Sequence, residues 1–196
     1  MEGETTLAQD LCARLCHDLV GPLGTVTGAL DMLEDDPEAA ELARDAATDL
    51  RRRLKFWRAA CGGISDTLAL SELSGLLDGM LAGGRASLAL KGMGTEEALP
   101  APVAQMLLVA ALLVGDALPR GGVVTLSREG EGLLLHPSGR AVAWPAPLLT
   151  VLRGEPALGP REVPAAMLGR LTVASRWRML VVPHEGEEAL ILSPAA

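Results

Sequence analysis

An apolar repeat over the first 33 residues constrains the fold more than any other feature of the chain. Its members recur at three- and four-residue steps, which is typical of one face of a long amphipathic helix; they are Leu7, Leu11, Leu15, Leu19, Val26, Leu30 and Leu33. At about 100° per residue, His17 points away from the mean direction of this face. We therefore predict a helix that presents one histidine to an incoming partner. The alternative is an ordinary surface histidine without a chemical role.

Three glycines fall near the face of His17. Gly21, Gly24 and Gly28 follow it by four, seven and eleven residues. A glycine inside a helix costs about 0.5–1 kcal/mol relative to alanine, so three on one face indicate that bare backbone is useful there. One interpretation is a docking surface on which the backbone of a partner approaches His17. The other is close packing against another helix of the same chain.

A second helix is predicted after a short loop. Asp36 is a suitable N-cap, Pro37 suits the first helical position, and Gly62 with Gly63 ends the helix. Two helices joined by a short loop form an antiparallel hairpin. One hairpin cannot cover its own apolar faces, so we expect two subunits to form a four-helix bundle. Packing of the hairpin on the rest of its own chain stays open as an alternative.

The late part of this second helix is basic, although the chain has a net charge of -8. Cations near a helix C-terminus complement the helix dipole and solvate its surface. The functional alternative is electrostatic attraction of an acidic partner. On that interpretation Arg51 and Arg52, together with Arg14 on the first helix, are candidate docking residues.

From residue 64 onward the pattern becomes mixed α/β. Helices are predicted at residues 71–81, 102–118 and 163–175, a strand at 85–90, and hairpins at 123–128 with 133–136 and at 179–182 with 189–192. We therefore divide the chain into a helical domain at residues 1–63 and an α/β domain at residues 64–196.

Composition excludes several classes of function. The acidic balance argues against nucleic acid as the partner. The longest apolar run, residues 103–114, is too short to span a membrane and indicates a buried helix. The first residues lack the basic and apolar regions of a signal peptide, so a cytoplasmic protein is expected.

The cysteines are expected to be free, buried thiols. There are three of them, Cys12, Cys16 and Cys61. Cys12 and Cys16 are separated by three residues, whereas a c-type haem site has two between its cysteines. A zinc site at Cys12, Cys16 and His17 would lack a fourth ligand nearby in the sequence. We therefore expect neither haem nor metal there.

The sequence around His17 resembles a known family. Residues 17–24 read His-Asp-Leu-x-Gly-Pro-Leu-Gly, with Leu-Cys-x-x-Leu-Cys before them and Gly-Ala-Leu-Asp-Met-Leu after them. This resembles the ChpT-type histidine phosphotransferases of alphaproteobacteria, which are relatives of the dimerisation and phosphoacceptor part of sensor histidine kinases. The resemblance implies that His17 is the phosphoacceptor and that Asp18 orients its imidazole and helps to deprotonate it. The chain departs from the family at Thr27, where an asparagine is usual.

The second domain resembles the ATP-binding domain of histidine kinases, a Bergerat-like α/β sandwich. The asparagine that holds magnesium in those kinases falls here at Leu113, which cannot ligate a hard cation. The Asp-x-Gly-x-Gly adenine loop and the Gly-x-Gly lid are also missing. The resemblance thus implies a degenerate ATPase-like domain that binds no cofactor.

Together these features predict a histidine phosphotransferase of a two-component phosphorelay. His17 would carry a phosphoryl group between receiver-domain aspartates of a hybrid kinase and of response regulators, with the receivers supplying the magnesium. The expected partners are a second copy of the chain and receiver domains, with neither nucleic acid nor a membrane, and no metal of the chain's own. The alternatives are an active histidine kinase and a non-catalytic dimeric adaptor for receiver domains.

Overall fold

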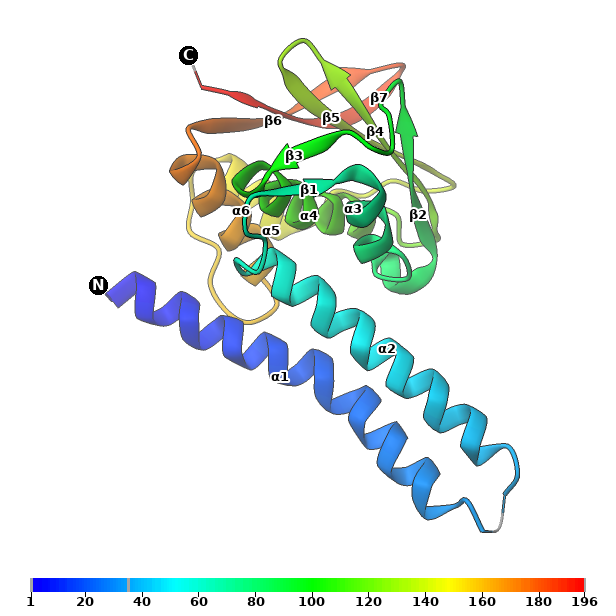
Figure 1. Cartoon of the computed structure of the whole chain (residues 1–196). Helices are drawn as coiled ribbons and strands as arrows, with labels where there is room; N and C mark the ends of the chain where they lie inside the picture. Colours follow the sequence, from blue (N-terminus) through cyan, green and yellow to red (C-terminus); the bar gives the residue numbers. More distant parts are fainter. Residues whose placement is uncertain (1, 35, 196) are drawn as a thin grey trace.

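The computed structural model describes residues 2–34 and 36–195, without the side chains of residues 2–5 and 82. A long helical hairpin extends from one side of a unit built of helices and a mixed sheet (Figure 1). Among the described residues, no helix is both long and apolar enough to cross a membrane.

The hairpin consists of α1 (Glu2–Asp31) and α2 (Ala39–Ala60). The helix α1 continues through Pro22, which lies inside it. The expected N-cap at Asp36 is wrong, because Glu38 is the N-cap and α2 begins at Ala39. Oδ1 of Asp36 instead accepts a hydrogen bond of 2.9 Å from the backbone N–H of Glu38 in the loop. The two helices run antiparallel side by side (Figure 1). The predicted antiparallel hairpin is therefore confirmed.

The main sheet has five strands in the order β2-β4-β5-β7-β6. Its strands are β2 (Ala86–Lys91), β4 (Gly122–Glu129), β5 (Gly132–Gly139), β6 (Trp177–His184) and β7 (Glu187–Pro194). Only β2 and β4 pair in parallel, and the other neighbours are antiparallel. Both predicted hairpins are confirmed, with Leu126 opposite Leu135 in the first and Val181 opposite Leu190 in the second.

Helices cover one face of this sheet (Figure 1). They are α3 (Leu70–Leu77), α4 (Ala101–Asp116), α5 (Ala146–Leu152) and α6 (Val163–Ala174), with a 3-10 turn η1 (Leu81–Gly84). A small antiparallel pair, β1 (Thr67–Ala69) and β3 (Ala98–Pro100), flanks α4. The predicted buried helix is confirmed as α4, since most of its side chains lie in the core.

The end of α2 anchors the hairpin in the α/β unit. Phe56 and Trp57 are buried, and Leu11 and Leu15 of α1 pack against the same core. The hairpin therefore packs against the unit near His17, while its far end projects away from the unit (Figure 1). The expected burial of the cysteines is wrong, because Cys12, Cys16 and Cys61 are all exposed. Cys12 and Cys16 lie on a side of α1 that the described residues leave exposed.

Candidate functional site

His17 lies on α1 at the mouth of an open cavity. Its side chain is 84 % exposed, which confirms the outward direction predicted from the apolar repeat. The cavity has a volume of about 670 Å³ and lies between α1 and the segment 158–162 that precedes α6; its lining residues are Ala13, Arg14, His17, Asp18, Leu158, Gly159, Pro160, Arg161 and Glu162. The ring of His17 is thus open to solvent in this structure.

Asp18 is held in place by two donors. Its Oδ2 accepts hydrogen bonds from Nε of Arg14 at 3.0 Å and from the indole Nε1 of Trp57 at 3.2 Å. Its side chain is only 11 % exposed. Because both donors bind the same oxygen, Oδ1 is left to face His17, whose Nδ1 lies 3.4 Å away. This long contact suits a tautomer in which Nδ1 carries the proton and Nε2 keeps a free lone pair.

The segment 158–162 forms the opposite wall of the cavity. The backbone N–H of Gly159 donates to Oδ2 of Asp10 at 2.9 Å, and that of Leu158 donates to Oε2 of Glu162 at 3.1 Å. The first bond ties the segment to α1, and it places Arg161 on the cavity that His17 lines. Sequence reasoning missed this wall, because the bonded residues are 149 positions apart and the segment has no periodic pattern.

Asp116, at the end of α4, is a further carboxylate that interacts with the charges of Arg14 and Asp18. Although Asp116 as a whole residue is exposed, desolvation of its carboxyl by the surrounding protein raises the pKa of this group. The charge of Arg14 opposes this effect, and the charge of Asp18 adds to it. Arg14 therefore interacts electrostatically with two carboxylates, Asp18 on its own helix and Asp116 in the α/β unit.

The three glycines form an exposed strip along α1. An added Cβ at Gly21, Gly24 or Gly28 would meet no atom within 4 Å among the described residues. Close packing of these glycines within the same chain is therefore wrong. The docking interpretation of the strip stays a prediction.

Arg51 and Arg52 lie away from the cavity of His17. Trp57, the α2 residue that contacts Asp18, follows Arg51 by six residues, which corresponds to about 9 Å along the helix axis. Nη1 of Arg52 is 3.5 Å from Oδ1 of Asp49, and its guanidinium covers Gly79, where an added Cβ would lie 2.7 Å from it. Arg51 is exposed on α2. Of the predicted docking residues, the cavity thus includes only Arg14.

Comparison with known proteins gives matches along most of the chain. The family model for the histidine phosphotransferase C-terminal domain matches residues 70–187. The protein phosphotransferase ChpT of Brucella abortus (strain 2308) is 27 % identical over 127 residues, which are 62 % of this chain and 60 % of that protein. The alignment therefore spans less than two thirds of this curated relative. The resemblance drawn from the motif around His17 is confirmed.

A solved structure with a high TM-score shares the fold. A structure described as a bacterial phosphotransferase superposes with a TM-score of 0.82 at 21 % identity and covers 95 % of each chain. The histidine kinase AdeS of Acinetobacter baumannii gives a TM-score of 0.47 at 13 % identity, over 91 % of this chain and 97 % of that one. The family match begins at residue 70, so the assignment of His17 depends on the motif and on the geometry described above.

Proposed function

The chain belongs to the histidine phosphotransferase family, and on that premise we propose that it carries a phosphoryl group on His17 between the aspartates of receiver domains. One observation carries the proposal. His17 is 84 % exposed, and its Nδ1 faces a carboxylate that two other side chains hold in place. This arrangement favours the tautomer with the proton on Nδ1, which would leave Nε2 free to react.

The phosphotransfer reaction requires that the imidazole of His17 be correctly positioned and that Nε2 have a free lone pair. Nε2 of His17 attacks the phosphorus of an aspartyl phosphate on the donor receiver. A P–N bond forms, the P–O bond to the aspartate breaks, and the donor carboxylate leaves with the bonding electrons. The imidazole becomes positively charged, and Asp18 stabilises that charge through Nδ1–H. The reverse displacement delivers the phosphoryl group to a second receiver, and the receivers supply the magnesium.

The cavity beside His17 and the glycine strip would form the receiver-docking surface. Receivers present acidic groups around their phosphoacceptor aspartate, so a cationic rim favours their approach. Arg161 supplies a positive charge on the cavity wall. Arg51 and Arg52 would contribute only to a receiver that also lies along α2. The glycines leave room for the backbone of the receiver next to His17.

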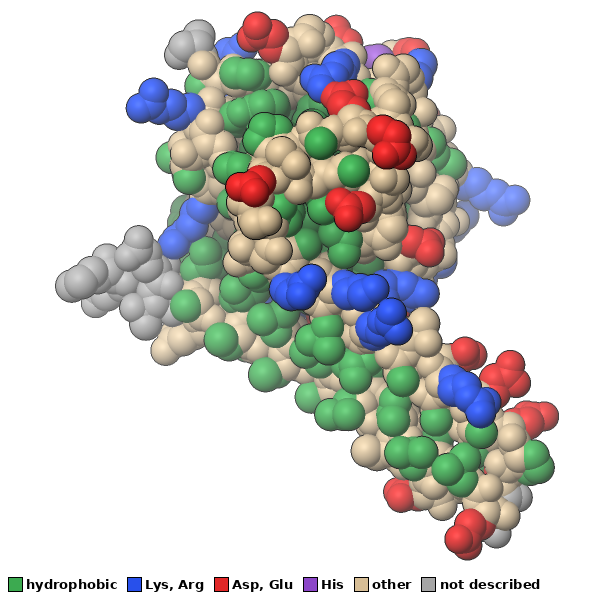
Figure 2. Space-filling model, viewed as in Figure 1, with side chains coloured by type: hydrophobic (Ala, Val, Ile, Leu, Met, Phe, Trp, Pro, Cys, Tyr) green, Lys and Arg blue, Asp and Glu red, His purple; other side chains and the backbone are tan. Residues whose placement is uncertain are grey.

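A homodimer would cover the remaining apolar surface of the hairpin. Side chains between 43 % and 64 % exposed gather there: Val20, Leu23, Leu30, Met32, Leu33, Leu42 and Leu54. Figure 2 shows hydrophobic side chains along the hairpin face in view. At about 100° per residue, Val20, Leu23 and Leu30 lie to one side of His17 rather than around it. A four-helix bundle built on this surface therefore leaves His17 accessible.

The α/β unit fits a degenerate ATP-binding domain better than an active one. Leu113, at the position of the magnesium-binding asparagine of kinases, is 3 % exposed and packs in the core. Its side chain offers no oxygen to a hard cation. This favours a carrier over the alternative of an active kinase. The second alternative, an adaptor, would bind receivers without ever being phosphorylated.

The test uses the full chain with two labelled phosphoryl donors. A receiver domain carrying labelled phosphate is mixed with the wild type and with His17→Gln in the presence of magnesium, and labelled ATP is offered in parallel. We expect acid-labile label on the wild type from the receiver only, and none on His17→Gln. Label taken from ATP would establish a kinase. Binding of the phosphorylated receiver without any transfer of label would establish an adaptor.

A further inference from the structure

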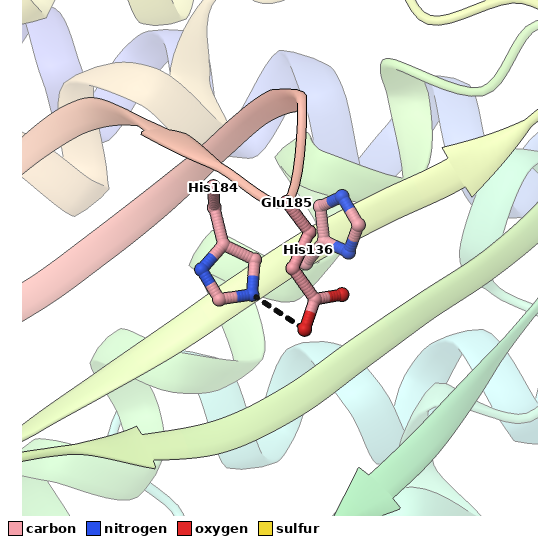
Figure 3. Close-up of side chains that lie close together, drawn as sticks. All are labelled: His136, His184 and Glu185. Atoms are coloured by element: carbon pink, nitrogen blue, oxygen red, sulfur yellow. Dashed lines mark ion pairs between the residues drawn. The ribbon is translucent and has the colours of Figure 1, made fainter.

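Two of the three histidines of the chain converge far from His17. His136 lies on β5 and His184 at the end of β6, and their ring centroids are 5.1 Å apart. Their side chains are 14 % and 26 % exposed, so both rings are largely shielded from solvent. Figure 3 shows both rings and the carboxylate of Glu185 pointing toward one another.

Two carboxylates complete the group. Oε1 of Glu185 is 3.8 Å from Nε2 of His184, and Oε2 of Glu187 is 3.0 Å from Nε2 of His136. One ligand atom each from His136, His184 and Glu185 lie within 4.8 Å of one another, and no other such group of three occurs among the described residues. The group thus holds two imidazoles and a carboxylate around one point, with a second carboxylate bonded to one of the rings.

We propose that His136, His184 and Glu185 bind a divalent transition-metal ion, with Zn²⁺ as the ion that the ligands fit best. Two imidazole nitrogens and one carboxylate are a ligand set typical of zinc, whereas Mg²⁺ and Ca²⁺ take oxygen ligands. The fourth position falls to water or to Glu187. Where Glu187 does not ligate, its bond to His136 orients that ring, as carboxylates commonly do for zinc-bound histidines.

The geometry needs only a small closure around the ion. Ligand atoms about 2.0–2.1 Å from a tetrahedral zinc are about 3.3 Å apart, so atoms already within 4.8 Å of one another have to approach by no more than about 1.5 Å. Glu185 lies in the tight turn between β6 and β7 and is half exposed, so its side chain has room to move closer to the two rings. His136 and His184 project from paired strands, which fixes their backbones.

The backbone of the turn supplies an independent observation. Glu185 has a φ of 49° and is followed by Gly186 with a φ of 87°. Two-residue hairpin turns of this kind favour asparagine, aspartate or glycine at their first position. A glutamate there adopts a disfavoured left-handed conformation, which is a feature that clusters at ligand sites. The turn therefore has a glutamate at a position where the backbone conformation favours asparagine, aspartate or glycine.

The ammonium of Lys91 competes with a metal ion for the carboxylate of Glu185. Its Nζ is 3.0 Å from Oε1 of Glu185, and the two side chains are 62 % and 57 % exposed. Exposed ion pairs of this type contribute little, because solvent and salt screen them. A divalent cation can therefore displace the ammonium. A substitution of Lys91 therefore distinguishes a metal site from a network of ion pairs, because it removes only the ammonium that competes with the metal for Glu185.

The test titrates zinc into the full chain and measures the binding heat by calorimetry. The absorption spectrum of the cobalt(II) complex is a second measurement. We expect one ion per chain, and a loss of affinity of ~10–100-fold or more in His184→Asn and in Glu185→Gln. Lys91→Gln should bind up to about fivefold more tightly, because the competing pair is gone. Glu185→Gln changes an exposed side chain, so its fold should be intact.

The control addresses the exposed thiols near His17. His17→Asn should bind zinc as the wild type does, and the cobalt complex should lack sulfur-to-metal charge-transfer absorption, because Cys12 and Cys16 lie elsewhere. Equal zinc affinity in the wild type and in His184→Asn would overturn the site. So would a thiolate band in the cobalt spectrum, or the absence of stoichiometric binding. None of these outcomes depends on phosphotransfer at His17.

Discussion

The indole Nε1 of Trp57 donates a hydrogen bond of 3.2 Å to Oδ2 of Asp18, across the two helices of the hairpin. Trp57 is 3 % exposed, so the donor is fixed by the core of the α/β unit. Arg14 donates to the same oxygen from within α1. The carboxylate beside His17 is therefore positioned by two donors, one on its own helix and one on α2 that is itself buried in the core.

Replacing Trp57 by phenylalanine should separate this hydrogen bond from packing. Trp57→Phe removes the donor to a charged acceptor but keeps an aromatic ring in the core. We expect a loss of about 1–3 kcal/mol in the free energy of unfolding, and slower phosphoryl acceptance by His17. The measurements are denaturant unfolding and a transfer time course.

Trp144→Phe is the matched control. Trp144 lies in the segment between β5 and α5, and its Nε1 donates to Oε2 of Glu188 on β7 at 2.8 Å. Trp144→Phe should leave the rate of phosphoryl transfer to His17 unchanged. A fully folded Trp57→Phe that accepts phosphate at the wild-type rate would contradict the positioning role of this bond.

Gly24 tests the exposed strip beside His17. An added Cβ meets nothing within 4 Å there, so Gly24→Ala should stabilise α1 by about 0.5–1 kcal/mol. Gly24→Leu should also leave the helix intact, but its bulk should slow transfer from a receiver. Melting temperatures and transfer rates measured on both variants give the comparison. Normal transfer by the leucine variant would remove the docking role of the strip.

Much of the fold could be predicted because its long elements have clear patterns. The period of α1 and the continuous apolar run of α4 each determine a helix without reference to the rest of the chain. The strands β1 and β3 have only three residues each, which is too short for a period to register. The cysteines show the converse error. Cys12 and Cys16 look like core residues, but the face of α1 on which they lie is left open by a single chain.

The site could be predicted only in part, because its support comes from distant segments. The motif identified His17 and Asp18, which are adjacent in the sequence. The donor Trp57 is 39 positions from Asp18, and the bond from Gly159 spans 149 positions. Local patterns carry no information on such contacts. The same reason hid the group of His136 with Glu187, which are 51 positions apart.

Arg161 should affect transfer without affecting stability. It lies on the wall of the cavity opposite His17, and we expect Arg161→Gln to weaken receiver binding and slow transfer at low salt. Its stability should stay within about 0.5 kcal/mol of the wild type, as for most surface substitutions. Arg178→Gln, on β6, removes the same charge elsewhere and serves as the control. Equal salt dependence of transfer in the two variants would argue against a role for Arg161.

Asp116 gives a prediction about pH. Desolvation raises the pKa of its carboxyl above the ordinary value of 3.8, so the folded state favours the protonated form. The contribution of Asp116 to stability is therefore complete below pH 3.8 and is lost as pH rises through the folded pKa. At pH 7 the ionised group lowers the stability of the fold, and Asp116→Asn should raise the free energy of unfolding there. The gain should shrink toward zero below pH 3.8, as followed by urea unfolding across a pH series. A variant that is less stable than the wild type at pH 7 would show instead that the attraction between Asp116 and Arg14 outweighs desolvation.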